Sequence, residues 1–126
     1  MHELSLAQGI LGLVEAAAAR ERFSRVRVLH LAAGALAGVE VSALRFALAS
    51  MAPGTCLDGA RIDIDEPPGA AWCVGCQQAV AILSRLDPCP QCGSMRLQVT
   101  GGADLRVVAL LVDDAPAWPP RPAALS

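Results

Sequence analysis

The N-terminal part of the chain carries a hydrophobic pattern with the period of a helix. Apolar residues recur at intervals of three and four between Leu4 and Ala18, which is typical of an amphipathic helix. Ser5 and Gln8 match the S-x-x-Q form of a capping box, so we expect the helix to start at about Leu6, after a free terminus. Because the first N–H groups of a helix have no acceptor within it, a terminus held there keeps its amides available to a metal.

Three later segments have the patterns of strands, and a second helical pattern lies between the first two. Residues 26–33 and 60–66 have the alternating faces of strands, whereas residues 105–112 are strongly apolar, which is typical of a central strand. The helical pattern at residues 40–51 would form a crossover, so the first two strands should be parallel. Residues 34–38 indicate a flexible turn. We therefore expect an α/β (α+β-like) fold, with two helices covering one face of a three-stranded mixed sheet.

Two C-x2-C pairs are the clearest chemical motif of the chain. Cys73 with Cys76 and Cys89 with Cys92 are separated by a loop of twelve residues. Two such turns facing each other bring four thiolates into a tetrahedron, the donor set of closed structural zinc sites. Gly93 permits a left-handed turn that points backbone N–H groups at sulfur. The pattern predicts a zinc ribbon, stabilised by Zn(II), in which the metal holds structure and takes no part in catalysis.

Four cysteines can serve purposes other than zinc binding. Disulfides would suit an oxidising compartment, but the spacing is characteristic of metal sites and we see no export signal. A thioredoxin-like redox pair needs one C-x2-C on a βαβ scaffold and not two facing each other. An iron cluster uses the same four thiolates and stays open on residue type alone.

The first three residues form a possible chelate. His2 is too large for Met1 to be trimmed, so the terminal amine should be that of Met1. The Met1 amine, the His2 amide and the His2 Nδ1 close a five-membered and a six-membered ring around a metal. Such planar nitrogen donors suit Ni²⁺ or Cu²⁺, with the Glu3 amide or carboxylate as the fourth donor. The alternative is that a histidine follows methionine by chance at a frayed terminus.

Composition limits the classes of function. The chain has 126 residues, 54% of them hydrophobic, which is enough for one ordinary domain with a core. No apolar run reaches the eighteen or so residues of a membrane span. The formal net charge of −2 lacks the basic stripe of a nucleic-acid binder. Zinc-binding cysteines without an export signal lead us to expect a cytoplasmic protein.

Several motifs together resemble one known family. They are Met1-His2-Glu3-Leu4-Ser5, then Gly34-x-Leu36-x-Gly38-Val39-Glu40, Ala43-Leu44-Arg45-Phe46-Ala47, Gly54-Thr55 and the two C-x2-C pairs. In order and spacing this set is similar to the HypA/HybF family of nickel metallochaperones in [NiFe]-hydrogenase maturation. The resemblance covers roughly residues 1–112 and is far more specific than any one motif.

The resemblance implies a function and a set of ligands. It implies a non-enzymatic chaperone that binds Ni(II) as cargo through Met1, His2 and Glu3, with structural Zn(II) on the four cysteines. It also implies delivery, with a HypB-type GTPase, to the hydrogenase large-subunit precursor, and some relatives serve urease. We expect a monomer or weak homodimer, without nucleic acid or membrane partners. A zinc-ribbon interaction module without a nickel role, or a redox enzyme using the cysteine pairs, would be the alternatives.

The same reading divides the chain into parts. Residues 1–66 with 103–114 would form the nickel-binding α/β domain, and residues 67–102 an inserted zinc-ribbon domain that returns through a hinge at Gly101-Gly102. Residues 115–126 would be a Pro-rich, disordered tail. Two residues outside these motifs need an account: Cys56 is expected to be a small buried hydrophobe, and His30 a partly exposed strand residue.

Overall fold

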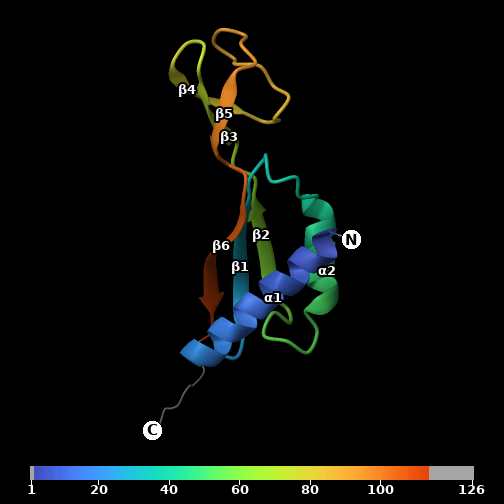
Figure 1. Ribbon diagram of the computed structural model, residues 1–126. Helices are drawn as coiled ribbons and strands as arrows, with labels where there is room; N and C mark the ends of the chain where they lie inside the picture. Colours follow the sequence, from blue (N-terminus) through green and yellow to red (C-terminus); the bar gives the residue numbers. More distant parts are fainter. Residues whose placement is uncertain (1, 114–126) are drawn as a thin grey trace. The chain divides into compact units, whose positions relative to one another are not determined.

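A computed structural model describes residues 2–113 of the chain. The Met1 amine and the predicted Pro-rich tail lie outside the described residues. The elements, in order, are α1 (His2–Glu21), β1 (Val26–Ala33), α2 (Val41–Met51), β2 (Arg61–Asp65), β3 (Gly69–Cys73), β4 (Gln78–Ile82), β5 (Leu97–Gly101) and β6 (Leu105–Val112) (Figure 1). Neither helix in this part of the chain is long and apolar enough to cross a membrane.

Helix α1 begins earlier than the capping box predicts. It starts at His2 and not at about Leu6, so the expected free terminus is helical from its second residue. No helix-breaking residue precedes Ser5, and Glu3 in the first turn has a charge that the positive end of the helix dipole favours. The Glu3 carboxylate also accepts a hydrogen bond from Glu40, the residue that precedes α2. The residues buried by α1 are Ala7, Ile10 and Val14.

The first sheet has the strand order β2-β1-β6. β2 and β6 run in opposite directions, so the sheet is mixed, as the sequence predicts (Figure 1). The prediction that residues 105–112 form the central strand is wrong: β1 is central and β6 is an edge. Val108 and Leu111 of β6 are 43% and 56% exposed, whereas Leu29 and Leu31 of β1 are completely buried. Apolar content alone does not show whether a strand has neighbouring strands on both sides or on one side only.

Helix α2 follows a cap supplied by Glu40. The Glu40 side chain accepts a hydrogen bond from the Ser42 backbone N–H at 3.1 Å, which satisfies one of the unpaired donors of the first turn. Leu44, Ala47 and Leu48 are buried, and α2 packs against α1. The helix expected at residues 40–51 is therefore present, with Glu40 as its N-cap.

The second sheet is antiparallel and has the order β4-β3-β5. Cys73, at the end of β3, lies opposite Gln78 of β4 and Leu97 of β5. Alternate residues of β3 are buried, as the period of a strand requires. The hydrophobic core of this sheet consists of Leu36, Ala71, Cys73, Val80, Ile82 and Cys89, with Cys76 and Leu97 packed against it.

The turn after β1 is anchored, in contrast to the flexible turn expected from its sequence. Four consecutive backbone N–H groups donate hydrogen bonds to backbone carbonyls, each with a donor–acceptor distance of 2.9 Å. The pairs are Gly34 to Asp104, Ala35 to Pro67, Leu36 to Gly102 and Ala37 to Gly34. The Leu36 side chain is 7% exposed. Small residues suggested freedom, but these bonds and this burial fix the segment.

The chain divides into two compact units. Of the described residues, the first comprises 2–30, 40–63 and 107–113, and the second Leu31–Val39 and Ile64–Arg106. The second unit, called the ribbon unit below, contains all four cysteines of the two C-x2-C pairs. The predicted domain boundaries at residues 67 and 102 stay a prediction.

Candidate metal-binding sites

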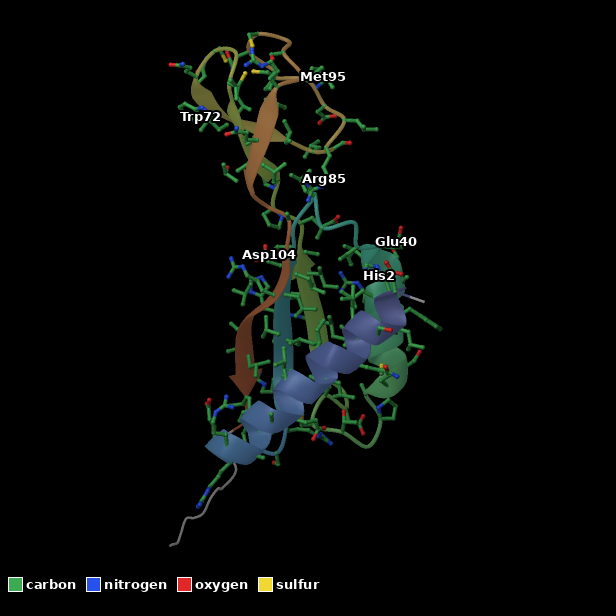
Figure 2. All side chains as sticks on the ribbon, in the orientation of Figure 1. His2, Glu40, Trp72, Arg85, Met95 and Asp104 are labelled. Atoms are coloured by element: carbon green, nitrogen blue, oxygen red, sulfur yellow. The ribbon has the colours of Figure 1, made fainter. Side chains whose placement is uncertain are left out.

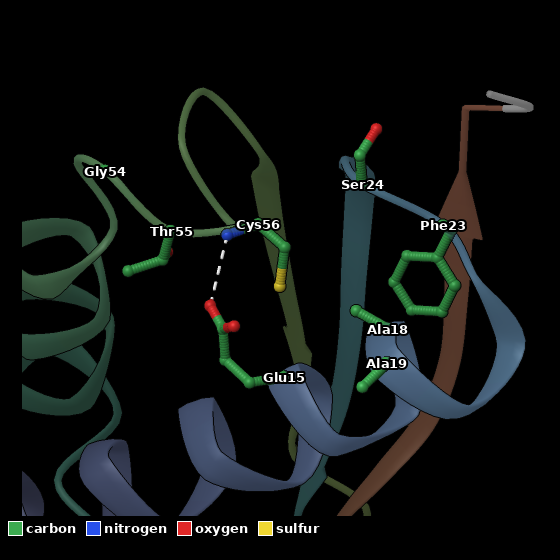
Figure 3. A pocket seen from close by; sticks show the side chains of 8 residues that line it. All are labelled: Glu15, Ala18, Ala19, Phe23, Ser24, Gly54, Thr55 and Cys56. Atoms are coloured by element: carbon green, nitrogen blue, oxygen red, sulfur yellow. Dashed lines mark hydrogen bonds between the residues drawn. The ribbon is translucent and has the colours of Figure 1, made fainter. Parts of the chain in front are cut away.

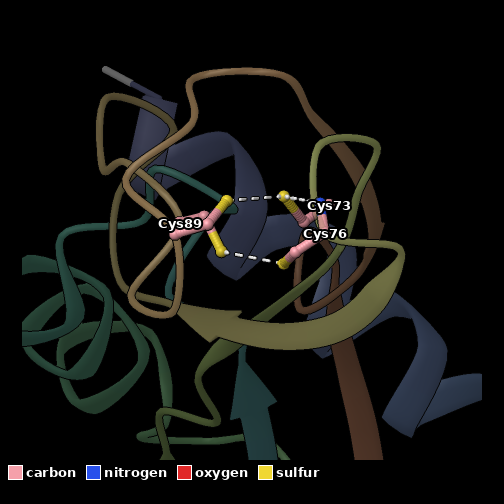
Figure 4. Close-up of side chains that lie close together, drawn as sticks. Cys73, Cys76 and Cys89 are labelled. Carbon is pink, nitrogen blue, oxygen red and sulfur yellow. Dashed lines mark hydrogen bonds between the residues drawn. The ribbon is translucent and has the colours of Figure 1, made fainter.

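The structure brings the four cysteines of the C-x2-C pairs together. Their sulfur atoms all lie within 4.8 Å of one another (Figure 4). The Sγ atoms of Cys73 and Cys92 are 3.6 Å apart and those of Cys76 and Cys89 3.7 Å. These separations are far from a disulfide bond and match the edges of about 3.8 Å in a tetrahedron of sulfurs about 2.3 Å from zinc. The donor set and its spacing fit one four-coordinate zinc ion.

Two similar knuckles hold the sulfurs. In each, the residue after the second cysteine has a positive φ, 55° at Gln77 and 78° at Gly93. Each of these residues donates its N–H to the carbonyl of the first cysteine of its pair, at 2.8 Å. The left-handed turn expected at Gly93 is confirmed, and Gln77 has the same conformation without the freedom of a glycine.

Backbone amides and neighbouring thiols make the four sulfurs unequal. Burial opposes ionisation of Cys89, but the N–H groups of Cys92 and Gln91 and the neighbouring thiols lower the pKa of its thiol to about 6. At Cys76 the Gln78 side chain lowers the pKa, yet burial and the other three sulfurs together raise it to about 12. Without a metal, Cys89 is thus the first of the four to become a thiolate. A bound cation is needed to keep all four thiols ionised.

The N-terminal residues lie at the open end of α1. The His2 side chain is 62% exposed, and its Nδ1 lies 3.7 Å from Glu3 Oε2. The Glu3 side chain is only 15% exposed, and its Oε2 accepts a hydrogen bond from the Glu40 backbone N–H at 3.0 Å. His2 and Glu40 lie close together in Figure 2. The helix places the amides of His2 and Glu3 among the first N–H groups, which lack an acceptor within α1.

Glu40 is the residue that sequence reasoning missed. Its N–H is the main cause that holds the pKa of the Glu3 carboxyl below its ordinary value of 4.5, followed by the N–H of Glu3 itself. The two residues are 37 positions apart. A glutamate just before an apolar helical pattern signals a cap, but nothing in the sequence indicates that its amide binds Glu3.

The fifth cysteine takes no part in the four-sulfur cluster. Cys56 is 7% exposed, and its backbone N–H donates to the Glu15 carboxylate at 3.2 Å (Figure 3). Burial, and then the negative charge of Glu15, raise the pKa of the Cys56 thiol. The expectation of a small buried hydrophobe is confirmed. His30 lies in β1 with an intermediate exposure, also as expected.

Comparison with known proteins decides the family. The chain matches the model of hydrogenase/urease nickel incorporation metallochaperone, HypA, over residues 1–112. It belongs to the HypA/HybF family. The hydrogenase maturation factor HypA of Cupriavidus necator is 61% identical over 90% of this chain and 96% of its own length. That of Polaromonas naphthalenivorans is 59% identical over 90% of this chain and 99% of its own length.

Solved structures show the same fold. The solution structure of the nickel metallochaperone HypA from Helicobacter pylori has a TM-score of 0.62 at 18% identity, covering 87% of this chain and 96% of that one. A second solution structure of a HypA protein has a TM-score of 0.64 at 21% identity, with 89% and 96% covered. The α+β class and its four-cysteine site, read from the sequence, are confirmed.

Membership of this family also sets the broad function. The family consists of metallochaperones that serve nickel incorporation and hydrogenase maturation, and not of enzymes. A redox enzyme built on the cysteine pairs is therefore excluded. A role in hydrogenase maturation implies interaction with other maturation components.

Proposed function

We propose that the protein binds Ni(II) at Met1, His2 and Glu3 and delivers it during [NiFe]-hydrogenase maturation, with structural Zn(II) on its four clustered cysteines. One observation carries the nickel site: His2 and Glu3 lie together at the open end of α1, in a chain of a nickel-incorporation family. The donors are those that Ni²⁺ prefers in tetragonal geometry, namely an amine, ionisable amides and an imidazole.

The exposure of the donors supports transfer of the metal rather than storage. The His2 imidazole is mostly open to solvent, so a receiving ligand can approach the metal while chain donors leave one at a time. Each nitrogen must lose a proton or remain unprotonated to bind, so nickel affinity should fall in acid. Glu3 is the fixed point of the site, because the Glu40 N–H holds its carboxylate in one place.

An apolar surface beside the terminus supports delivery through direct docking of proteins. Leu4 and Phe46 are 45% and 75% exposed, although both are large hydrophobic residues. They line a hollow of about 260 Å³ together with Glu3, Ala43, Ala47 and Ser50. An exposed apolar patch at a metal-binding terminus suits a protein partner. A HypB-type GTPase and the hydrogenase large-subunit precursor are the partners we propose.

The test is metal binding by a tag-free protein that begins at Met1. Calorimetry should show one titratable nickel, and metal analysis one retained zinc. His2→Ala should lose the nickel and keep the zinc, whereas His30→Gln, which alters the other histidine of the chain, should keep both. If His2→Ala binds one nickel as tightly as the unaltered protein, the terminal site is wrong.

A second variant tests the zinc site separately. Cys73 is completely buried in the core of the ribbon unit. Cys73→Ser should lose stoichiometric zinc and the local fold of that unit, because zinc binding and folding are coupled in such sites. Full zinc retention would count against the four-thiolate site. Zinc without His2-dependent nickel would leave the alternative, a zinc-ribbon interaction module without a nickel role.

A further inference from the structure

A hollow of about 420 Å³ lies beside the second half of α1 (Figure 3). Ala18, Ala19 and Phe23 form an apolar wall, and among the described residues that line the hollow Glu15 alone is charged. Cys56 and the two residues before it line the opposite side. Pockets of about 300–1,000 Å³ hold small organic groups, so this hollow has room for an aromatic side chain.

The described part of the chain ends next to this hollow. The Asp113 backbone N–H donates to the Arg25 carbonyl at 3.1 Å, and the Asp113 carboxylate pairs with Arg27 Nε at 3.5 Å. Ser24, the residue before Arg25, lines the hollow. All of these residues belong to the first compact unit. Residues 114–126, called the C-terminal segment below, therefore follow directly on a residue that is bonded beside the wall of the hollow.

The C-terminal segment complements the hollow in chemistry. Trp118 is its one aromatic residue, and Arg121 has its one charged side chain after Asp114. A tryptophan combines a large apolar surface with an N–H that donates. The Glu15 carboxylate accepts a hydrogen bond from the Cys56 N–H at 3.2 Å, and a carboxylate can accept several such bonds. The charge of Arg121 is also opposite to that of Glu15. An indole ring from this segment therefore suits the hollow.

The short connection favours docking within one chain. Five residue steps separate Trp118 from Asp113, and they span at most about 18 Å. A short linker gives an effective concentration on the order of millimolar, so a contact with a dissociation constant of about that size would be formed roughly half of the time. The prolines of the segment fix φ, which reduces the conformational entropy lost on docking. The same weak contact between two copies at micromolar concentration would be almost empty.

We propose that Trp118 of the C-terminal segment docks in this hollow within its own chain. The segment then links the end of β6, an edge strand, to α1 and to the loop between α2 and β2. The family match ends at residue 112, so the docked segment is an addition to the part of the chain that the family shares. It is also separate from the proposed nickel site, because Glu15 follows His2 by thirteen residues of α1, a rise of about 20 Å.

The first experiment measures the fluorescence of Trp118 in the full-length, zinc-loaded protein. Trp72→Phe removes the other tryptophan of the chain, which is 41% exposed in the ribbon unit, so the emission reports Trp118 alone. The docked indole should emit at shorter wavelength, and be quenched less by acrylamide, than in the urea-unfolded chain. Emission and quenching equal to those of the unfolded chain would overturn the proposal.

Two substitutions on α1 show whether the hollow holds the indole. Ala19→Arg, added to Trp72→Phe, fills the hollow and should shift the emission and quenching of Trp118 to the values of the unfolded chain. Ala16→Arg is the matched control, because it adds the same side chain at an exposed position of α1 that does not line the hollow. It should change neither reading. Equal readings in the two arginine variants would place Trp118 elsewhere and overturn the proposal.

Dilution distinguishes docking within one chain from docking between two copies. Within one chain the emission of Trp118 in Trp72→Phe should stay the same as the protein is diluted, because the effective concentration is set by the linker. Emission that shifts toward the unfolded value on dilution would assign the hollow to the segment of a second copy and overturn the proposal.

Hydrogen exchange tests the consequence for the end of β6. Docking should slow exchange at the Asp113 amide, which bonds to Arg25, so Trp118→Ala should speed it while leaving nickel and zinc binding unchanged. In a Trp118→Ala background, Ala19→Arg should have no further effect on this amide, because the contact that it blocks is already absent. An Asp113 amide that exchanges equally fast with and without Trp118, or an Ala19→Arg effect of the same size in both backgrounds, would overturn the proposal.

Discussion

Gln77 and Gly93 are equivalent residues in the two knuckles of the cysteine cluster. Each follows the second cysteine of its pair, has a positive φ, and donates its N–H to the carbonyl of the first cysteine at 2.8 Å. One position therefore has the residue that this backbone conformation favours, and the other has a residue for which it is strained.

Substitution by alanine should therefore have a larger effect at Gly93 than at Gln77. Gly93→Ala introduces a left-handed non-glycine residue and should cost about 1–2 kcal/mol. Because ribbon folding and zinc binding are linked, competition with a chelator should show zinc affinity lowered by roughly 5- to 30-fold. Gln77→Ala replaces one strained side chain with another and should change zinc affinity little. Equal losses in both variants would contradict this account of the knuckles.

The contact between Glu3 and Glu40 predicts a pH dependence. Since the Glu40 N–H lowers the pKa of Glu3 in the folded state, this carboxylate stabilises the fold fully above its ordinary value of 4.5. The contribution is lost as the pH falls through the lowered folded value. In an NMR titration the part of the Glu40 amide movement that Glu3 causes should therefore be centred below pH 4.5.

Glu3→Gln provides the control for this titration. Its amide oxygen can still accept the hydrogen bond but does not titrate, so the part of the Glu40 amide movement that Glu3 causes should disappear, and only the part caused by the Glu40 carboxyl itself should remain. A Glu40 amide that moves identically in the unaltered protein and in Glu3→Gln would show that the hydrogen bond is absent in solution.

Local patterns gave the element boundaries wherever one physical signal dominated. α2 ends before a proline and a glycine and has an apolar face, and β1 is found with the bounds predicted for it. The start of α1 was missed because Ser5 offers a good cap, while the bond from Glu40 to Glu3 favours the longer helix. The central strand was misjudged because an apolar run, as in β6, does not reveal which strands flank it.

Local sequence patterns predict the cysteine cluster but not the surroundings of the N-terminus. Four cysteines with fixed spacing are nearly sufficient to define a cluster, since the ligand chemistry and the turn geometry lie within each pair. The setting of the terminus depends on Glu40, 37 residues from Glu3, and the ribbon core on Leu36, whose neighbours are distant in sequence. Contacts of this kind arise only when tertiary packing brings the segments together.

The five cysteines should separate into two groups by reactivity. In zinc-loaded protein at pH 8 none should react quickly with iodoacetamide, because four are metal-bound and Cys56 is buried with a raised pKa. A chelator should expose four, and denaturant the fifth. Mass spectrometry counts the labels, and Cys56→Ala should lose only the last. Rapid labelling of Cys56 in folded protein would contradict its burial beside Glu15.

Gly102 should tolerate no side chain, in spite of the flexibility that its sequence context suggests. Its φ is +74°, and a Cβ atom there would lie 2.5 Å from the Pro68 carbonyl oxygen and 2.6 Å from the Gly69 Cα. Both obstacles are backbone atoms, so Gly102→Ala should lower the free energy of unfolding by about 1–3 kcal/mol or more. Gly12→Ala in α1 is the matched control, because its Cβ would meet nothing within 4 Å. That change should raise stability by about 1 kcal/mol through helix propensity. Urea unfolding of zinc-loaded protein measures both, and a Gly102→Ala protein as stable as Gly12→Ala would show that Gly102 is a free hinge after all.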